Sequence, residues 1–298
     1  MRVRILGSAA GGGFPQWNCR CPTCEAARGG VDARPRTQSS IAIRGAEGPW
    51  LLANASPDLR QQLEGLAAEP TEGVRAAPVA GVLLTDAEID HTAGLLLLRE
   101  SASPIRVHGS EQVRRALTDG YPVLRILEDY SGVEWRTLEP GGPAALDGSS
   151  LEVESFGAGG DAPRYLARTG ADVEATGLVF RDGATGGVLT YVPGLARLDD
   201  DVLGRLAASD VVLVDGTFWR DDELAALGIS ERTARQMGHV PLSGPDGSLA
   251  ALAALDRARV VLVHINNTNP VLLERSPERE AVLRAGVEVA EDGLEIEL

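Results

Sequence analysis

The stretch Gly81-Val-Leu-Leu-Thr-Asp-Ala-Glu-Ile-Asp-His91 joins a short apolar run to three carboxylates and an imidazole. The run is branched and uncharged, as is typical of a strand that is covered on both faces. Residues 92–98 then read as the start of a buried helix. The acidic cluster therefore lies at a strand-to-helix turn, where α/β proteins tend to carry their functional side chains. We interpret Asp90 and His91 as metal ligands.

Two further apolar runs end on a side chain that can bind a metal. Val211–Val214 is followed by Asp215, and Val260–Val263 is followed by His264. The carboxyl ends of strands in one sheet meet at the same edge, so we expect these side chains to converge. The sequence predicts an α/β fold in which two sheets pack face to face with helices outside. It also predicts a single domain over residues 1–298.

Turn and cap signals place the remaining elements. Ser56 and Pro57 are typical of a helix start, as the N-cap and the first helical residue. The elements expected are a strand at 1–7, a helix at 58–63, antiparallel strands between 140 and 187, and helices at 198–208 and 249–256, the last capped by Ser248.

Composition excludes several classes of protein. The 298 residues are 44% hydrophobic, which is enough to bury a large core, and the formal net charge of -15 argues against binding to nucleic acid or to an anionic membrane. No apolar run approaches the roughly 18 residues of a membrane span, so we expect a cytoplasmic protein. All 28 basic residues are arginine, which excludes lysine-based catalysis. The sequence does not determine the oligomeric state, and a homodimer is one candidate.

The three cysteines form one cluster, at Cys19, Cys21 and Cys24. Three thiolates this close together can bind one tetrahedral zinc ion at roughly 2.3 Å each, with a fourth ligand from elsewhere. An odd number of cysteines in one loop fits metal binding better than a disulfide framework. We therefore predict a structural zinc ion and a zinc-binding loop at about residues 14–30.

The histidines differ in their surroundings. His108 has no acidic neighbour in the sequence, and we expect a structural role for it. For His239 two roles are open: it could support the loop structure, or it could contact substrate or act as an acid–base group. His264 precedes a run of side-chain amides that could orient a ligand. We interpret Asn266, Asn267 and Asn269 of that run as substrate-binding residues.

Five motifs give the chain a resemblance to a known family. They lie at residues 7–19, 85–91, 214–219, 237–241 and 264–270. The chain resembles the pyrroloquinoline quinone (PQQ) biosynthesis protein B family, which belongs to the metallo-β-lactamase superfamily. The resemblance spans almost the whole chain. It implies an αββα sandwich of two mixed sheets, in agreement with the architecture that the strand pattern predicts.

The chain departs from the usual ligand pattern of that superfamily. The superfamily motif reads His-x-His-x-Asp-His, whereas here the first two histidines are replaced by Asp86 and Glu88. The third histidine of the superfamily has no counterpart between residues 150 and 200. The superfamily also has an aspartate that bridges the two metal ions, and residues 191–194, at the corresponding place here, contain no aspartate. Asp90, His91 and His264 remain, and two histidines with one carboxylate are the ligand set of non-haem Fe(II) oxygenases.

The resemblance implies a reaction of that class. It is the iron- and O2-dependent hydroxylation of the tyrosine ring in a cross-linked Glu-Tyr precursor of PQQ. Fe2+ would be the catalytic cofactor, held by Asp90, His91 and His264, and Zn2+ the structural one. Arg36, Arg164 and Arg181 are candidates for binding the carboxylates of this substrate.

Four further residues are candidate catalytic groups. Asp86 or Glu88 could orient His91 or receive the phenolic proton, and Asp215 could orient His264. His239 is the fourth candidate, as an acid–base group.

Two alternative functions remain open. A hydrolase of the superfamily's common type would need Asp86 and Glu88 as ligands of a second metal ion. A carrier of PQQ or its precursor would bind zinc at the cysteines alone.

The fourth zinc ligand is also open. In related members of the superfamily a histidine three positions after the final-strand histidine completes the cysteine site, and here that position is Asn267. Another residue or a water molecule could be the fourth ligand, or His264 could turn toward the zinc ion.

Overall fold

The computed structural model describes residues 1–66, 78–167 and 173–298. Its strands form two mixed sheets. The first sheet has the order β14 (Glu295–Glu297), β1 (Arg2–Gly7), β2 (Ser40–Arg44), β3 (Trp50–Ala53), β4 (Val79–Leu83), β5 (Ile105–Gly109) and β6 (Val133–Thr137). The second has the order β13 (Glu288–Val289), β12 (Arg259–Val263), β11 (Val211–Asp215), β10 (Val188–Val192), β9 (Ala175–Asp182), β8 (Leu151–Gly159) and β7 (Pro143–Ala145).

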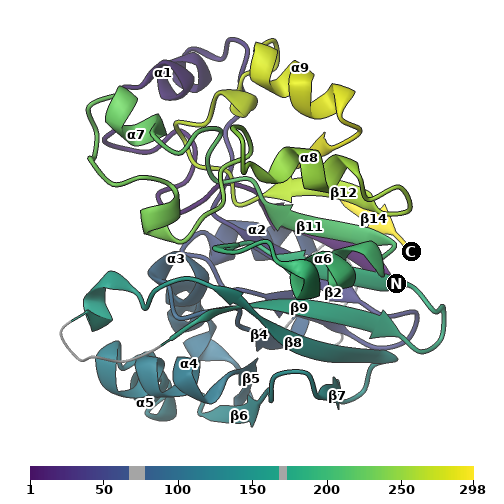
Figure 1. Ribbon diagram of the computed structural model, residues 1–298. Helices are drawn as coiled ribbons and strands as arrows, with labels where there is room; N and C mark the ends of the chain where they lie inside the picture. Colours follow the sequence, from purple (N-terminus) through teal and green to yellow (C-terminus); the bar gives the residue numbers. More distant parts are fainter. Residues whose placement is uncertain (67–77, 168–172) are drawn as a thin grey trace.

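The helices are short and connect the strands (Figure 1). They are α1 (Pro22–Gly29), α2 (Leu59–Leu66), α3 (Ile89–Thr92), α4 (Glu111–Arg115), α5 (Val123–Glu128), α6 (Asp200–Ala207), α7 (Glu223–Ala226), α8 (Ser248–Ala253) and α9 (Pro277–Arg284). Tighter 3-10 turns span Ala93–Glu100, Arg164–Leu166, Arg235–Met237 and Pro270–Leu272, and a π-helical turn spans Ala116–Gly120.

The sheets pack face to face through apolar side chains. Ile5 and Leu83 of the first sheet share one buried cluster with Phe180 and Val263 of the second. Each fully buried side chain of this size contributes about 1.5–3 kcal/mol relative to an exposed one. This shared cluster forms the centre of the sandwich.

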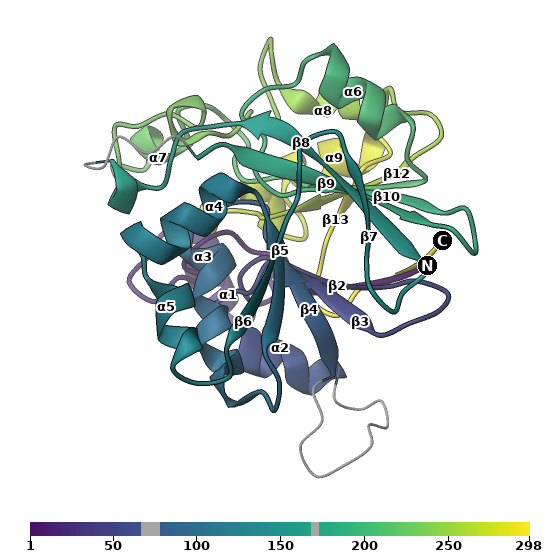
Figure 2. The same ribbon diagram turned by 90° about the horizontal axis from the view of Figure 1, so that it is seen from below.

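Helices cover the two outer faces (Figure 2). The outer face of the first sheet packs against α2, α4 and α5, with Leu59, Val113 and Leu127 among the buried side chains. The outer face of the second packs against α6 and α8, with Leu206 and Leu252. The layers are therefore helix, sheet, sheet and helix, which confirms the predicted fold class.

The strands expected at the N-terminus and between residues 140 and 187 are confirmed as β1 and as β7, β8 and β9, within the described ranges. The chain from residue 92 was expected to begin a buried helix, but α3 begins at Ile89 and continues as a 3-10 turn in which Leu97 is exposed.

Several predicted helix boundaries shift. The helix expected from Asp58 begins at Leu59, because the Ser56 hydroxyl and carbonyl accept the backbone N–H groups of Asp58 and Leu59. The helix expected at 198–208 is α6, which is capped by Asp199 through the Val202 N–H at 3.0 Å.

The expected cap of α8 is wrong. Ser248 is the first residue of the helix, its hydroxyl is buried without a hydrogen-bond partner, and the helix ends at Ala253 rather than at residue 256.

The strands that carry candidate ligands end at one end of the sandwich. β11 and β12 are parallel neighbours in the second sheet, with Asp215 opposite Val263. β4 lies in the first sheet. The ligands therefore converge from both sheets rather than from a single sheet edge. Among the described residues, no helix has the length and apolar surface needed to cross a bilayer.

Candidate metal centre

His91 is held by the turn that follows β4. Its Nδ1 donates to Asp86 Oδ2 at 2.7 Å, and the Thr85 hydroxyl donates to the same oxygen at 2.8 Å. The Glu88 N–H donates to the other oxygen of Asp86 at 2.9 Å. His91 is 2% exposed, and its Nε2 is buried without a hydrogen-bond partner. A buried imidazole nitrogen with no partner marks a place for a ligand, and a metal ion fits it.

His264 follows β12 in a strained backbone conformation, with a φ of 54° that is uncommon for a residue other than glycine. The Thr217 hydroxyl donates to Asp215 Oδ1 at 2.6 Å, so its oxygen is left to accept the Nδ1–H of His264 at 2.8 Å. This tautomer leaves the lone pair on Nε2, which lies 3.4 Å from Asp90 Oδ2. The hydrogen bond from Nδ1 to Thr217 therefore leaves Nε2 of His264 facing Asp90, where it can bind a metal ion.

His239 enters the same site from the loop after Arg235–Met237. Its Nδ1 donates to Asp215 Oδ2 at 2.6 Å, and its ring stacks on His264 with 5.4 Å between centroids. The Val240 N–H donates to the Leu195 carbonyl at 2.7 Å, so this loop lies beside Gly194, which carries no side chain. Asp215 was expected to orient His264. It contacts His239 directly and reaches His264 through Thr217.

The carboxylates and imidazoles of the site shift each other's pKa values. Burial alone would raise the pKa of Asp90, but His91 and His264 hold it below its usual range. Burial alone would lower the pKa of His91, but Asp86 and Asp90 raise it to about 9. Without a cation, a proton on His91 offsets part of the charge of the buried carboxylates beside it. A metal ion would take the place of that proton.

Two overlapping groups of side chains can hold a metal ion. The ligand atoms of Asp90, His91 and His264 lie within 4.8 Å of one another, and so do those of Asp215, His239 and His264. The first group is the more complete site, because both carboxylate oxygens of Asp215 already accept hydrogen bonds from Thr217, His239 and the backbone. The three ligands predicted for the active-site metal are therefore brought together.

A cavity of about 250 Å³ opens over these side chains. A Cβ at Gly11, which lines it, would come within 3.1 Å of Asp90 Oδ2, so a larger residue there would press on this carboxylate. A larger hollow of about 760 Å³ lies at the amino ends of β4 and β5, away from the imidazoles. The smaller cavity is the one that can present a substrate to the metal ligands.

The arginines that are candidates for binding the substrate do not line the cavity. Among the described residues that line the cavity, none is an arginine. Arg36 is buried away from it and donates to the Ser8 hydroxyl at 3.2 Å, while Arg164 and Arg181 lie outside the lining. The cavity instead carries carboxylates, including Asp161.

Glu88 is the carboxylate best placed to exchange a proton. It lines the cavity, and burial, followed by the charges of Asp86 and Asp90, raises its pKa to about 7. An acid or base with a pKa near neutrality is suited to proton transfer. Asp86 is committed to His91, so of the two roles predicted for these carboxylates, Asp86 takes the orienting one.

Only one of the three predicted substrate-binding asparagines faces the cavity. Asn266 lines it. Asn269 is fully buried, and its side chain donates to the Gly216 carbonyl at 2.9 Å and accepts from the Val271 N–H at 3.0 Å. Asn267 is buried against the sulfurs of Cys21 and Cys24. Asn267 and Asn269 are therefore corrected to positions outside the substrate cavity.

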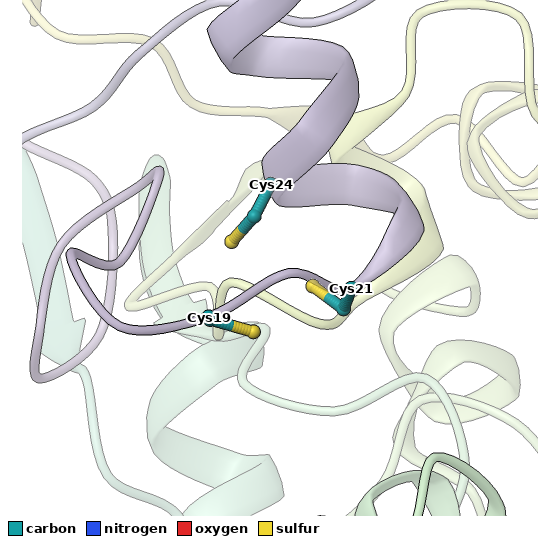
Figure 3. Close-up of side chains that lie close together, drawn as sticks. All are labelled: Cys19, Cys21 and Cys24. Carbon is teal, nitrogen blue, oxygen red and sulfur yellow. The ribbon is translucent and has the colours of Figure 1, made fainter.

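The cysteine cluster forms as predicted. Cys21 caps the N-terminus of α1 and Cys24 lies in its first turn, so part of the expected loop is helical. The three sulfur atoms lie within 4.8 Å of one another, and the side chains point toward a common centre (Figure 3). All three are free thiols, and burial raises the pKa of Cys24 to about 11. The donor set suits zinc.

The sequence interpretation missed Thr217. Its hydroxyl links Asp215 to His264, and its position two residues after a strand-ending aspartate was the available signal. His108, in contrast, is buried at the end of β5, outside the cavity lining, as its structural role requires.

Comparisons with known proteins agree with this geometry. A family model described as a beta-lactamase superfamily domain matches residues 49–265. Coenzyme PQQ synthesis protein B of Methylococcus capsulatus is 46% identical over 310 residues, with 100% of both chains covered. The corresponding protein of Pseudomonas putida is 44% identical over 304 residues, again with full coverage of both.

Solved structures give the same result. A crystal structure of Zn2+-bound PqqB from Methylobacterium extorquens matches with a TM-score of 0.91 and 40% identity over the whole of both chains. A diphosphatase of the PhnP family has a TM-score of 0.70 at 19% identity, covering 100% of this chain and 98% of its own, and shares the fold.

Proposed function

Because the chain belongs to the family of coenzyme PQQ synthesis protein B, within the beta-lactamase superfamily, we propose that it hydroxylates the tyrosine ring of a cross-linked Glu-Tyr precursor in PQQ synthesis. The step depends on Fe2+ and O2. The relatives' names support the pathway, and the donor set of the metal centre supports the reaction class.

The observation that carries the proposal is the convergence of Asp90, His91 and His264. Two imidazoles and one carboxylate on one face of a metal ion leave the other face for oxygen and substrate. A bound Fe2+ supplies the activation of O2. In hydroxylation one oxygen atom enters the ring and the other leaves as water, with two electrons and two protons from an external reductant such as ascorbate.

The residues around the triad hold and orient the reactants. Asp86 and Thr217 fix the tautomers of His91 and His264, so each offers Nε2 to the metal. Glu88 lines the cavity beside the triad and is the carboxylate that accepts the phenolic proton. His239 is held by Asp215 beside the triad and is a second group that can hold or move a proton.

The charge of the cavity constrains how the substrate binds. Carboxylates line the cavity and the described lining holds no arginine, so the carboxylates of the precursor are repelled from its floor. The phenol carries no charge and is not repelled in this way. The ring therefore enters first and the carboxylates stay at the mouth.

The arrangement argues against a two-metal hydrolase. Such an enzyme would need Asp86 as a ligand of a second ion, but its oxygens accept hydrogen bonds from His91, Thr85 and the Glu88 N–H. Gly194 also offers no bridging carboxylate. The Methylobacterium extorquens protein binds Zn2+, and the three cysteines here are a donor set that suits zinc.

The test is oxygen uptake by protein that is loaded with Fe2+ without air and then given the Glu-Tyr precursor and ascorbate. We expect oxygen consumption and a product heavier by one oxygen atom, both abolished in His91→Ala. His108→Gln is the matched control, because it replaces a buried histidine outside the site, and it should retain the activity. If the protein binds the precursor but binds only zinc and consumes no oxygen, the hydroxylase proposal fails and the carrier function takes its place.

A further inference from the structure

Asn266 lines the cavity over the metal ligands, and its backbone is held from both sides. Its N–H donates to the Thr217 carbonyl at 3.0 Å, and its carbonyl accepts from the Asn269 N–H at 2.9 Å. Both partners are buried. The side chain of Asn266 therefore starts from a fixed place in the cavity wall.

A buried carboxylate outside the cavity decides which way this side chain points. Glu223, the first residue of α7, is 6% exposed. Its Oε2 accepts from the Trp219 N–H at 2.7 Å, and its Oε1 accepts from the Thr268 hydroxyl at 2.5 Å. Burial raises the pKa of Glu223, and these two donors act in the opposite direction by favouring the ionised form. Because a carboxylate cannot donate, the hydroxyl of Thr268 has to.

The hydroxyl of Thr268 has a single proton, which is used on Glu223. Its oxygen can then only accept a further hydrogen bond, and it accepts from Nδ2 of Asn266 at 2.5 Å. This contact distinguishes the two ends of the amide, which are otherwise nearly equal in shape. The carbonyl oxygen Oδ1 makes no described hydrogen bond within the protein. Asn266 therefore presents a hydrogen-bond acceptor to the cavity.

The charge of the cavity selects the kind of donor that suits this acceptor. Four carboxylates belong to the described lining, which contains no arginine: Asp86, Glu88, Asp90 and Asp161. A divalent metal ion offsets two of these charges, so the lining keeps a negative potential. A neutral N–H or O–H group satisfies Oδ1 but gains little from this potential. An ammonium group gains from both, because its hydrogen bond is charge-assisted.

We propose that Oδ1 of Asn266, oriented by Glu223 through Thr268, binds a primary ammonium group of the substrate. The cavity then takes a phenol that carries an ammonium group on its side chain. Glu223 and Thr268 are positioning residues, because they act through Asn266 and lie outside the lining of this cavity. Assigning the ammonium group to the Glu-Tyr precursor rests on the proposed function, whereas the direction of the amide does not.

The test compares the binding of three small phenols to protein loaded with Zn2+, which has no redox chemistry. Tyramine carries an ammonium group, 4-ethylphenol has no charged group, and 3-(4-hydroxyphenyl)propionate carries a carboxylate. Ligand-detected nuclear magnetic resonance at neutral pH measures each dissociation constant. We expect tyramine to bind about tenfold more tightly than 4-ethylphenol, since a hydrogen bond to a charged group is one of the stronger kind.

Asn266→Ala tests the acceptor itself. It removes Oδ1, so the preference for tyramine over 4-ethylphenol should fall about tenfold, while 4-ethylphenol binds as before.

Glu223→Gln tests the direction of the amide. The Trp219 N–H can only donate, so the oxygen of the new amide pairs with it and the NH2 group faces Thr268. Thr268 then donates to Asn266, which turns its own NH2 group to the cavity. Tyramine should lose its preference, and the carboxylate compound should bind more tightly than it does to the natural protein. Glu231→Gln, which removes a charge from an exposed position outside the lining, is the control and should bind all three phenols normally.

Three results would overturn the proposal. They are equal binding of tyramine and 4-ethylphenol to the natural protein, a preference that survives Asn266→Ala, and unchanged binding in Glu223→Gln. Circular dichroism shows whether each variant folds, and Asn266→Ala, at a partly exposed position, keeps the test available if Glu223→Gln does not. A preference that depends on Asn266 in a protein that consumes no oxygen would overturn the proposed function alone. Hydroxylation with a preference indifferent to Asn266 would overturn only the ammonium site.

Discussion

The two candidate metal sites of this molecule are built in opposite ways. The cysteine cluster takes its three sulfurs from residues 19–24, within one loop and the first turn of α1. The histidine–aspartate centre takes its ligands from the ends of β4 and β12, in two different sheets, with His239 added from a distant loop. The local chain supplies all three sulfurs of the first site, whereas the ligands of the second meet only when the sandwich has formed.

The donor atoms differ as well. Soft thiolates select zinc and need all four positions filled, which suits a structural ion. Imidazole and carboxylate ligands accept harder metals and leave positions for substrate. Mutations at the cysteines should therefore act mainly on stability, and mutations at the histidine–aspartate centre should act on metal affinity and turnover.

The largest effect is expected from Cys24→Ser, which removes a fully buried sulfur from the cluster. The variant should lose its structural zinc, and its free energy of unfolding should fall by about 3 kcal/mol or more, because metal binding contributes to folding. Metal analysis and urea unfolding measure the two effects. Ala26→Ser, in the same helix, is the control and should retain its zinc. A Cys24→Ser protein with full zinc content and stability would contradict the structural assignment.

Next in size is Asp86→Asn at the other site. The amide cannot hold the Nδ1–H of His91 as the carboxylate does, so metal affinity at the histidine–aspartate centre should fall about ten- to a hundredfold. Chelator competition with Fe2+ under nitrogen measures it. Asp161→Asn, which also removes a cavity carboxylate but contacts none of the imidazoles by a described hydrogen bond, should change affinity far less. Equal losses in both variants would show that general charge, not orientation, matters.

Thr217→Val should have a smaller effect of the same kind. It removes the hydroxyl that accepts the Nδ1–H of His264, and we expect a loss of about tenfold in metal affinity. Thr217→Ser keeps the hydroxyl and should restore the affinity. Failure of the Ser variant to do so would mean that the threonine methyl group, rather than the hydrogen bond, is required.

The smallest effect is expected from His108, a buried histidine outside the metal centre. Burial, followed by the charge of Arg106, lowers the pKa of His108 to about 4, against about 6.5 in the unfolded chain. Below pH 6.5 the unfolded state binds a proton that the folded state does not, so stability falls as the pH drops toward 4. The loss is about 1 kcal/mol at pH 6. His108→Gln should lose less stability than the natural protein over that range in urea titrations.

Much of the fold could be predicted because its signals are local. The apolar runs before Asp86, Asp215 and His264 identify buried strands, and ligands that follow them lie close together, although β4 belongs to a different sheet from β11 and β12 rather than to the same one as expected. Helix boundaries were predicted less well. Whether Ser248 caps α8 depends on the backbone conformation of Gly247, which the residue types do not determine.

The parts of the site that could be predicted from the sequence lie near the ends of strands. His264 follows β12 directly, and Asp90 and His91 lie in α3, just beyond the turn after β4. The approach of His239 depends on a hydrogen bond between Val240 and Leu195 that the sequence does not reveal. The asparagines after His264 were misassigned for a related reason. Polarity predicts a contact, but the direction of each side chain follows from the strained turn at His264.

The central claim is that Asp90, His91 and His264 hold a metal ion with positions open to oxygen. Nitric oxide is a stable substitute for O2, and electron paramagnetic resonance detects its adduct with Fe2+. Protein loaded with Fe2+ without air should give an iron–nitrosyl signal that changes when the Glu-Tyr precursor is added and is absent from His264→Ala. An unchanged signal in His264→Ala, or no iron bound beyond the zinc of the cysteine cluster, would contradict the account.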